Sequence, residues 1–133
     1  RNSLISIIPT STGAARAVGE VLPELKGKID GSAIRVPTPN VSLVDFKFLS
    51  KRNTDENELI KIFTNAESGH LKSIIETTSK PLVSPDFNHN PHSSIIDISE
   101  IKVLNNNFCR VLSWYDNEWG FSNRLVDVAK KML

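Results

Sequence analysis

The sequence predicts an α+β domain built on a mixed, mainly antiparallel sheet, with about three helices covering one face of that sheet. Short apolar segments separated by tight turns, such as the asparagine run at 105–107, predict antiparallel strands. Three segments with apolar residues at helical spacing interrupt these strands without strict alternation. Bulky residues occupy both sides of the segment 108–115, so we expect the other sheet face to lie in subunit contacts.

The individual elements follow from periodicity and from turn residues along the chain. The expected strands cover residues 33–36, 41–49, 73–77, 82–83, 93–98, 101–104 and 108–113. The expected helices cover residues 12–22, a segment from 54 to about 69, and a segment from the turn near 117 to the C terminus. Val41 and Leu43 have the opposite parity to Val44 and the phenylalanines that follow it, which predicts a bulge or burial on both faces.

Size and charge restrict the class of protein. At 133 residues the chain fits one domain with a sizeable core. Its 16 basic and 15 acidic residues are interspersed, so there is no electrostatic footprint for nucleic acid or for an anionic membrane. No apolar run has the length of a membrane span, and a single cysteine, Cys109, suits a reducing compartment. We therefore expect a cytoplasmic protein without nucleic-acid or membrane partners.

The first residues indicate a start inside a longer protein. The chain opens with Arg1 instead of methionine and continues at once into an apolar, β-prone segment at residues 4–8 that needs partners. Processing to a mature N terminus is the alternative, although no context for processing is visible. We expect the sequence to be a fragment.

Two segments together suggest a phosphate-binding site. Thr12 and Gly13 stand at an expected helix start, where free backbone N–H groups and the helix dipole attract anions and glycine allows close approach. Arg35 lies in an otherwise apolar strand, and its guanidinium group matches the geometry of a phosphate. The plainer interpretations are an ordinary capped helix and a pair between Arg35 and a protein carboxylate. The sequence leaves these alternatives open.

The segment 113–124 is the densest in chemical groups, because it holds both tryptophans, the single tyrosine and a cluster of acids and amides. Its pattern predicts a strand-to-helix turn with Asn117 at the turn itself. The side-chain amide of Asn117 can either cap the helix or face an amide group of a ligand. The residue type alone favours the cap.

The remaining reactive residue types have structural interpretations. Cys109 lies among apolar residues and is expected to be buried and inert. His89 and His92 are separated by a proline-containing turn, and no further cysteine or histidine completes a metal site. His70 is expected at a helix end, and Asp86 in a turn. The sequence contains neither a G-x-G-x-x-G motif nor a complete nucleophile–base set, so we assign no catalytic residue and no metal.

Several motifs in a fixed order carry a resemblance. They are I-I-P-T-S-T-G-A-A at 7–15, R-V-P-T-P-N-V-S at 35–42, D-F-N at 86–88, P-H-S-S at 91–94 and the segment 113–124. This series resembles the C-terminal part of phosphorylating glyceraldehyde-3-phosphate dehydrogenases, particularly the bacterial ones. Phe121 departs from the tyrosine of many members, which removes a hydroxyl beside the nicotinamide site.

The resemblance implies a place in a larger enzyme. Residues 1–133 would form the C-terminal part of the catalytic domain, whereas the NAD-binding Rossmann domain, the nucleophilic cysteine and the base histidine would lie upstream. Members of this family are glycolytic oxidoreductases that convert glyceraldehyde 3-phosphate and inorganic phosphate to 1,3-bisphosphoglycerate with NAD, and they form homotetramers. The chain alone is therefore expected to be inactive.

The resemblance also implies a role for each candidate site residue. Thr12 and Gly13 would hold the attacking phosphate, and Arg35 would face the phosphates of substrate and reactant. Asn117 would orient the nicotinamide carboxamide.

Two other functions compete with this interpretation. One is the erythrose-4-phosphate dehydrogenase relative, which we rank lower because the motifs at 11–15 and 114–116 keep the glyceraldehyde-3-phosphate pattern. The other is a non-catalytic assembly module, whose support is the missing nucleophile.

Overall fold

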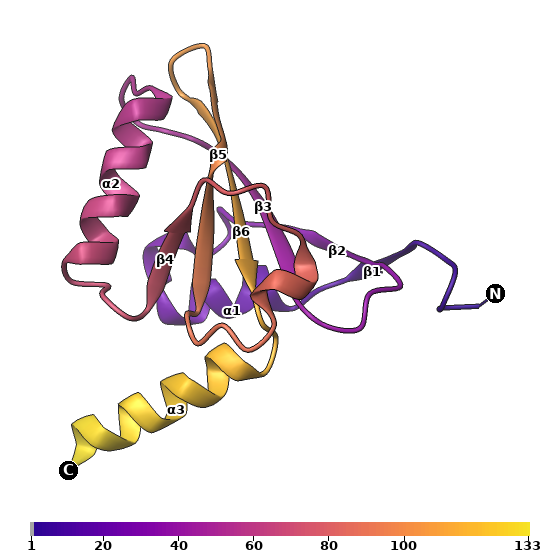
Figure 1. Cartoon of the computed structure of the whole chain (residues 1–133). Coiled ribbons are helices and arrows are strands. Elements are labelled where there is room, and N and C mark those ends of the chain that lie inside the picture. Colours follow the sequence, from indigo (N-terminus) through magenta and orange to yellow (C-terminus); the bar gives the residue numbers. More distant parts are fainter. Residues whose placement is uncertain (1) are drawn as a thin grey trace. The chain divides into compact units, whose positions relative to one another are not determined.

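The computed structural model describes residues 2–133, so Arg1, on which the expectation of an internal start partly rests, lies outside the described residues. The chain forms two compact units, Arg1–Pro39 and Asn40–Leu133. Over the described residues there are three α-helices, a two-stranded antiparallel sheet and a four-stranded mixed sheet (Figure 1). These elements confirm the predicted α+β class with mainly antiparallel pairing.

The first unit is a β-ribbon with one helix. Strand β1 (Ile8–Ser11) pairs antiparallel with β2 (Ser32–Arg35), and between them lie α1 (Ala14–Val21) and the 3₁₀ turn η1 (Pro23–Leu25). The apolar residues at 4–7 stay outside the ribbon, because Asn2 forms a local turn there: its side chain accepts a hydrogen bond from the Leu4 N–H at 2.9 Å. The β-prone segment thus forms a strand only from its last residue onward.

The second unit contains the larger sheet. It consists of β3 (Ser42–Leu49), β4 (Ile75–Thr78), β5 (Ser94–Leu104) and β6 (Phe108–Tyr115), in the spatial order β3-β6-β5-β4. Strand β6 pairs antiparallel with both neighbours, whereas β4 and β5 are parallel. The long connection between β4 and β5 allows this parallel pairing, since a tight turn could not reverse the chain twice.

Strand β5 differs from the prediction. The segments 93–98 and 101–104 form one strand, β5, whose register with β6 shifts between Asp97 and Lys102. At this irregularity the Asp97 carboxylate accepts hydrogen bonds from the Ser99 N–H at 3.2 Å and from the Ser99 hydroxyl at 2.6 Å. The sequence pattern suggested a break between two strands at this point. The structure instead has one strand with a register shift, at which Asp97 and Ser99 make a local side-chain contact.

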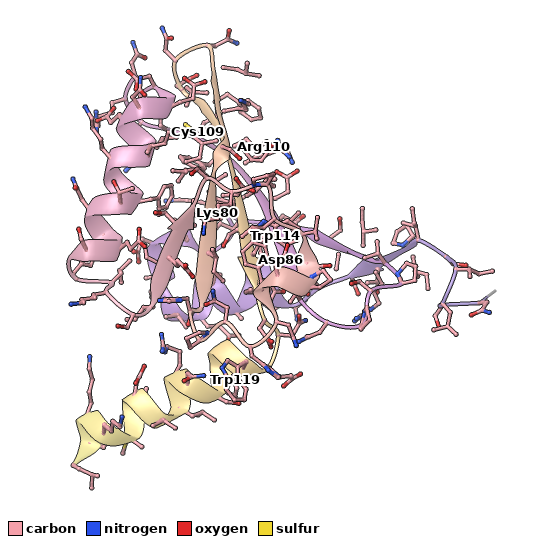
Figure 2. All side chains as sticks on the ribbon, in the orientation of Figure 1. Lys80, Asp86, Cys109, Arg110, Trp114 and Trp119 are labelled. Atoms are coloured by element: carbon pink, nitrogen blue, oxygen red, sulfur yellow. The ribbon has the colours of Figure 1, made fainter. Side chains whose placement is uncertain are left out.

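The predicted strand at 82–83 is absent, and a turn takes its place. The 3₁₀ turn η2 (Ser84–Phe87) begins here, and the Val83 N–H donates to the Asp86 carboxylate at 2.8 Å. Asp86 thus has the local turn role expected from the sequence. Figure 2 shows Asp86 on η2 next to Trp114 of β6, and the ring of Phe87 stacks on Trp114 with the centroids 5.0 Å apart.

Strand β3 explains the parity change near its start without a bulge. Its pairing with β6 is continuous from Ser42 opposite Tyr115 to Leu49 opposite Phe108. Val41 precedes the strand with φ at +72°, and its side chain is buried. A left-handed residue therefore directs this valine into the core before regular alternation begins.

The core of the second unit lies mainly between α2 (Glu56–Ser68) and the sheet. Helix α2 packs against β4 and β5, and its N terminus is capped by Asp55, which accepts a hydrogen bond from the Glu58 N–H at 2.8 Å. The cluster of buried residues comprises Leu59, Ile96, Ile101, Cys109 and Val111. Cys109 is fully buried, with its Sγ 3.5 Å from the Asn107 carbonyl oxygen, which confirms its structural interpretation.

The last helix, α3 (Trp119–Met132), starts just beyond β6 and extends away from the sheet (Figure 1). Its outer residues Phe121, Leu125 and Val128 are more than half exposed. No helix in residues 2–133 has the length and apolar character needed to cross a bilayer.

Candidate functional site

The start of α1 provides the first group of candidate residues. Strand β1 ends at Ser11, and two exposed residues, Thr12 and Gly13, lead into the helix. The Thr12 hydroxyl oxygen accepts a hydrogen bond from the Ala14 N–H at 3.2 Å. The first N–H groups of a helix have no helical acceptor, and they carry the positive end of the helix dipole. Thr12 thus occupies the Ala14 N–H, and the other N–H groups of this first turn have no helical acceptor.

Gly13 is not required by the conformation of the chain itself. Its backbone angles are φ −86° and ψ −3°, which any residue adopts. A β-carbon added at Gly13 would meet no described atom within 4 Å. Neither backbone strain nor packing therefore explains the glycine, and its remaining physical advantage is the close approach of another molecule to its N–H group.

Arg35 lies on β2, the strand of the ribbon that follows this helix in the chain. Arg35 is the last residue of β2 and pairs with Ile8, which lies four residues before Thr12. The backbones of Arg35 and Thr12 are therefore about 14 Å apart along the ribbon, at ~3.4 Å per residue. The side chain of Arg35 is exposed. The Arg35 side chain makes no hydrogen bond or ion pair with residues 2–133. The carboxylate partner considered as an alternative is thus not found in the described part of the chain.

A hollow of about 440 Å³ lies beside α1, with Thr12 at its edge. Arg16 and Lys26 add positive charge to its wall, and Glu20 and Asp30 add negative charge. Neither Gly13 nor Arg35 lines this hollow. The mixed charge does not select an anion, so the start of α1 and Arg35, at opposite ends of the ribbon, remain the better phosphate candidates.

Asn117 belongs to the second unit, in the turn between β6 and α3. Its side chain is exposed, and its Oδ1 accepts a hydrogen bond from the Ser42 hydroxyl at 3.0 Å. Among residues 2–133 the amide NH₂ group of Asn117 has no acceptor. A hollow of about 240 Å³ adjoins it, lined also by Tyr115, Phe121 and Arg124. An anchored carbonyl thus leaves two amide donors available beside an open space.

Asn117 does not cap α3, and the N–H groups at the helix start bond to the side chain of Asp116 instead. The Oδ1 atom of Asp116 accepts hydrogen bonds from the Glu118 N–H at 3.1 Å and from the Trp119 N–H at 2.9 Å. These donors lie two and three residues after Asp116, whereas the side-chain oxygen of Asn117 accepts from Ser42. Aspartate is a preferred capping residue, so the sequence carried this signal, but the choice between neighbouring polar residues required the backbone geometry.

Asp116 also connects the turn to two distant loops. Its Oδ2 atom accepts hydrogen bonds from the Asn40 amide and from the His89 N–H, both at 2.9 Å. The Asn40 amide additionally donates to the Asn88 side-chain oxygen at 2.7 Å. Only 3% of Asp116 is exposed, so these donors replace water around the buried carboxylate. The sequence did not indicate this connecting role, because Asn40 and His89 are far from Asp116 along the chain.

The histidines occupy structural positions in the same region. The His89 ring lies 4.8 Å from the ring of Trp119, which Figure 2 shows in the first turn of α3. The His92 Nδ1 lies 2.8 Å from the Asn90 side-chain oxygen and 3.3 Å from the Glu76 carboxylate. No group of three or more potential metal ligands gathers within the described chain.

The Asp116 contacts predict a pH dependence of stability. Burial raises the pKa of Asp116, but hydrogen bonds from Trp119, His89, Glu118 and Asn40 outweigh it, so the pKa lies below its ordinary value. Because the folded pKa is depressed, the carboxylate stabilises the fold above about pH 4 and loses this contribution as the pH falls through the folded pKa.

We therefore expect an Asp116→Ala variant to lose less free energy of unfolding between pH 5 and pH 3 than the unchanged protein. Urea titrations at the two pH values measure this difference. Asp45, Glu56 and Glu58 also have lowered pKa values, but they titrate in both proteins and cancel in the comparison. An equal loss in both proteins would show that Asp116 does not contribute.

Comparisons with known proteins agree on one family. The family model described as glyceraldehyde 3-phosphate dehydrogenase, C-terminal domain, matches residues 1–117. A glyceraldehyde-3-phosphate dehydrogenase of Xanthobacter flavus is 57% identical over 132 residues, which are 99% of this chain and 39% of that protein. Proteins of the same name from Cereibacter sphaeroides and Zymomonas mobilis are each 54% identical over 99% of this chain and 40% of their own length.

The chain therefore spans about 40% of the length of these relatives. The family match covers the Thr12–Gly13 helix start, Arg35 and Asn117 together. The extent of the family model and the identities over nearly the whole chain lead to one conclusion: the chain belongs to the glyceraldehyde-3-phosphate dehydrogenase family, in its C-terminal domain.

Proposed function

We propose that residues 1–133 are the C-terminal part of the catalytic domain of a phosphorylating glyceraldehyde-3-phosphate dehydrogenase. The whole protein oxidises and phosphorylates glyceraldehyde 3-phosphate to 1,3-bisphosphoglycerate, with NAD as hydride acceptor. The main support is the open helix start at Thr12 and Gly13 on the same ribbon as the unpaired Arg35, in a chain of this family. A cytoplasmic homotetramer is part of the proposal.

The phosphate site uses two kinds of donor. The N–H groups after Thr12 bind phosphate oxygens, since they lack helical acceptors and carry the positive end of the dipole. Arg35 supplies a charged fork that can donate two parallel hydrogen bonds. Because the two groups are about 14 Å apart along the backbone, the arginine side chain has to extend towards the helix for both to contact one anion. A substrate with its own phosphate offers a second anion for Arg35.

Asn117 recognises the nicotinamide end of the cofactor. Ser42 occupies the Asn117 carbonyl oxygen, so the free NH₂ group can donate to the carbonyl oxygen of a carboxamide. The adjoining hollow with Tyr115 and Phe121 provides apolar surface next to this donor. The residues therefore fit the nicotinamide group, which accepts a hydride when NAD is bound.

The described residues supply binding groups and no nucleophile. Cys109 is fully buried beneath α2, and its surroundings are apolar. A thiolate nucleophile needs exposure and a positive or basic neighbour, so Cys109 is unsuited to attack an aldehyde. The nucleophilic cysteine and the base histidine are expected in the upstream part of the protein, together with the Rossmann domain.

An assay of the whole protein tests this function. With glyceraldehyde 3-phosphate, inorganic phosphate and NAD, we expect NADH formation that stops when phosphate is omitted. Erythrose 4-phosphate under the same conditions should be the poorer substrate. The chain of residues 1–133, assayed alone, should form no NADH.

The possible outcomes separate the three functions. A preference for erythrose 4-phosphate would favour the related dehydrogenase. Absence of turnover by a folded whole protein with every substrate would favour a non-catalytic module. NADH formation by residues 1–133 alone would contradict the assignment of the nucleophile to the upstream part.

A further inference from the structure

We propose that Asp116 is the positioning residue that holds Asn117 towards the nicotinamide end of the cofactor. The proposal rests on the proposed function, and it adds to that function a buried carboxylate whose four hydrogen bonds are all made within the protein. Its basis is the set of contacts that residues 40–42 make with the two neighbouring residues of the β6–α3 turn.

Asp116 is held by hydrogen bonds to both oxygens of its carboxylate. Both carboxylate oxygens accept two hydrogen bonds, one pair from the start of α3 and the other from Asn40 and His89. The carboxylate therefore joins three segments that are far apart in sequence. Because Asp116 is almost fully buried, its four contacts fix the backbone on which the next residue stands.

Asn117, the next residue, is held by the same segment as Asp116. Asn40 donates to Asp116, and Ser42 donates to Asn117. Between the two donors lies Val41, whose φ of +72° is costly for a β-branched residue. Its buried side chain packs with Phe87 and Ile95. These contacts hold the segment 40–42 in one conformation. In it, the side chain of Asn40 reaches Asp116 and that of Ser42 reaches Asn117.

The groups around the side chain at position 116 require acceptor atoms there. All four of its partners are N–H donors, so only a group with two acceptor oxygens satisfies them. An asparagine has the same shape, but in either orientation its NH₂ group would face two donors. An Asp116→Asn variant therefore keeps the volume and disturbs the turn that carries Asn117.

The test measures the affinities of the whole protein for NAD and for ADP-ribose, which lacks the nicotinamide. We expect Asp116→Asn to weaken NAD binding by about tenfold, the effect of roughly one hydrogen bond between neutral amide groups. ADP-ribose binding should stay within about twofold, because Asn117 contacts only the missing end of the ligand. Isothermal titration calorimetry or fluorescence titration measures both affinities.

Three further variants complete the experiment. Asn117→Ala should weaken NAD binding as Asp116→Asn does, and the double variant should show no additional loss, because both changes act on one contact. Glu118→Gln removes an exposed neighbouring carboxylate and should change neither affinity. If Asp116→Asn does not fold, Asn40→Ala replaces it, since it removes one of the four contacts and should weaken NAD binding about threefold.

The failures of the two proposals are distinguishable. If Asn117→Ala leaves NAD binding unchanged, the nicotinamide role of Asn117 in the proposed function is wrong. If Asn117→Ala weakens NAD binding but Asp116→Asn and Asn40→Ala do not, the positioning role of Asp116 is wrong. Equal losses of NAD and ADP-ribose affinity in Asp116→Asn would also overturn it, since they indicate general damage.

Discussion

An Arg35→Leu variant of the whole protein should have a kcat/KM at least about 100-fold lower for both inorganic phosphate and glyceraldehyde 3-phosphate. The estimate corresponds to about 3 kcal/mol, as expected for the loss of a two-bond contact between guanidinium and phosphate. Arg35 has no partner in residues 2–133, so its removal breaks no internal ion pair. The loss should therefore appear in turnover and leave the thermal unfolding midpoint nearly unchanged.

Arg52→Leu is the matched control. Arg52 is also exposed, and its side chain forms an ion pair with Glu58 at the start of α2. An exposed pair of this kind contributes about 0–1 kcal/mol, so the control should alter stability slightly and turnover not at all. Steady-state rates measured over a range of phosphate and aldehyde concentrations compare the two variants. Unchanged kinetics in Arg35→Leu would remove Arg35 from the phosphate site.

The largest loss of stability is expected from Ile95→Ala. Ile95 is 1% exposed and packs with Val41 and Phe87 beneath Trp114. Truncation of such a side chain leaves a cavity and typically costs about 2–5 kcal/mol. Urea unfolding followed by tryptophan fluorescence is a suitable measurement, since Trp114 stacks on Phe87 in the same cluster.

Ile62→Ala provides the comparison for this prediction. Ile62 lies on α2 with 47% of its surface exposed, so the same change of side chain should cost less than about 1 kcal/mol. The larger loss expected for Ile95→Ala reflects the cavity that truncation leaves at a buried site. A similar loss in both would show that the Val41, Phe87 and Ile95 cluster is not the stabilising contact inferred from the packing.

The candidate site divides into parts that the sequence could predict and parts that it could not. Hydroxyl residues and glycine before an amphipathic segment predicted the helix start at Thr12 and Gly13, because capping is a local property. The turn at Asn117 was predicted for the same reason. The role of Asp116 depends on Asn40, which is 76 residues away, and no local pattern indicates that contact.

The fold shows the same distinction. Helix α2 begins at Glu56 and has acidic residues in its first turn, as the local pattern indicated. The segment 82–83 looked like a strand by composition, but the Leu82 N–H bonds to the Lys80 carbonyl oxygen and the Val83 N–H to the Asp86 carboxylate. Strand preference is thus overridden where a side chain offers the backbone a closer acceptor.

Position 41 illustrates how narrowly this fold limits the residues that it can accept. The left-handed backbone favours glycine or asparagine, whereas the buried cluster around Phe87 and Ile95 requires an apolar side chain. Glycine would suit the backbone and leave a void, and asparagine would bring an amide into apolar surroundings. No common side chain meets both demands, so valine is a compromise. Substitutions that look conservative by chemical type are therefore poorly tolerated at the residue between the two side chains that reach Asp116 and Asn117.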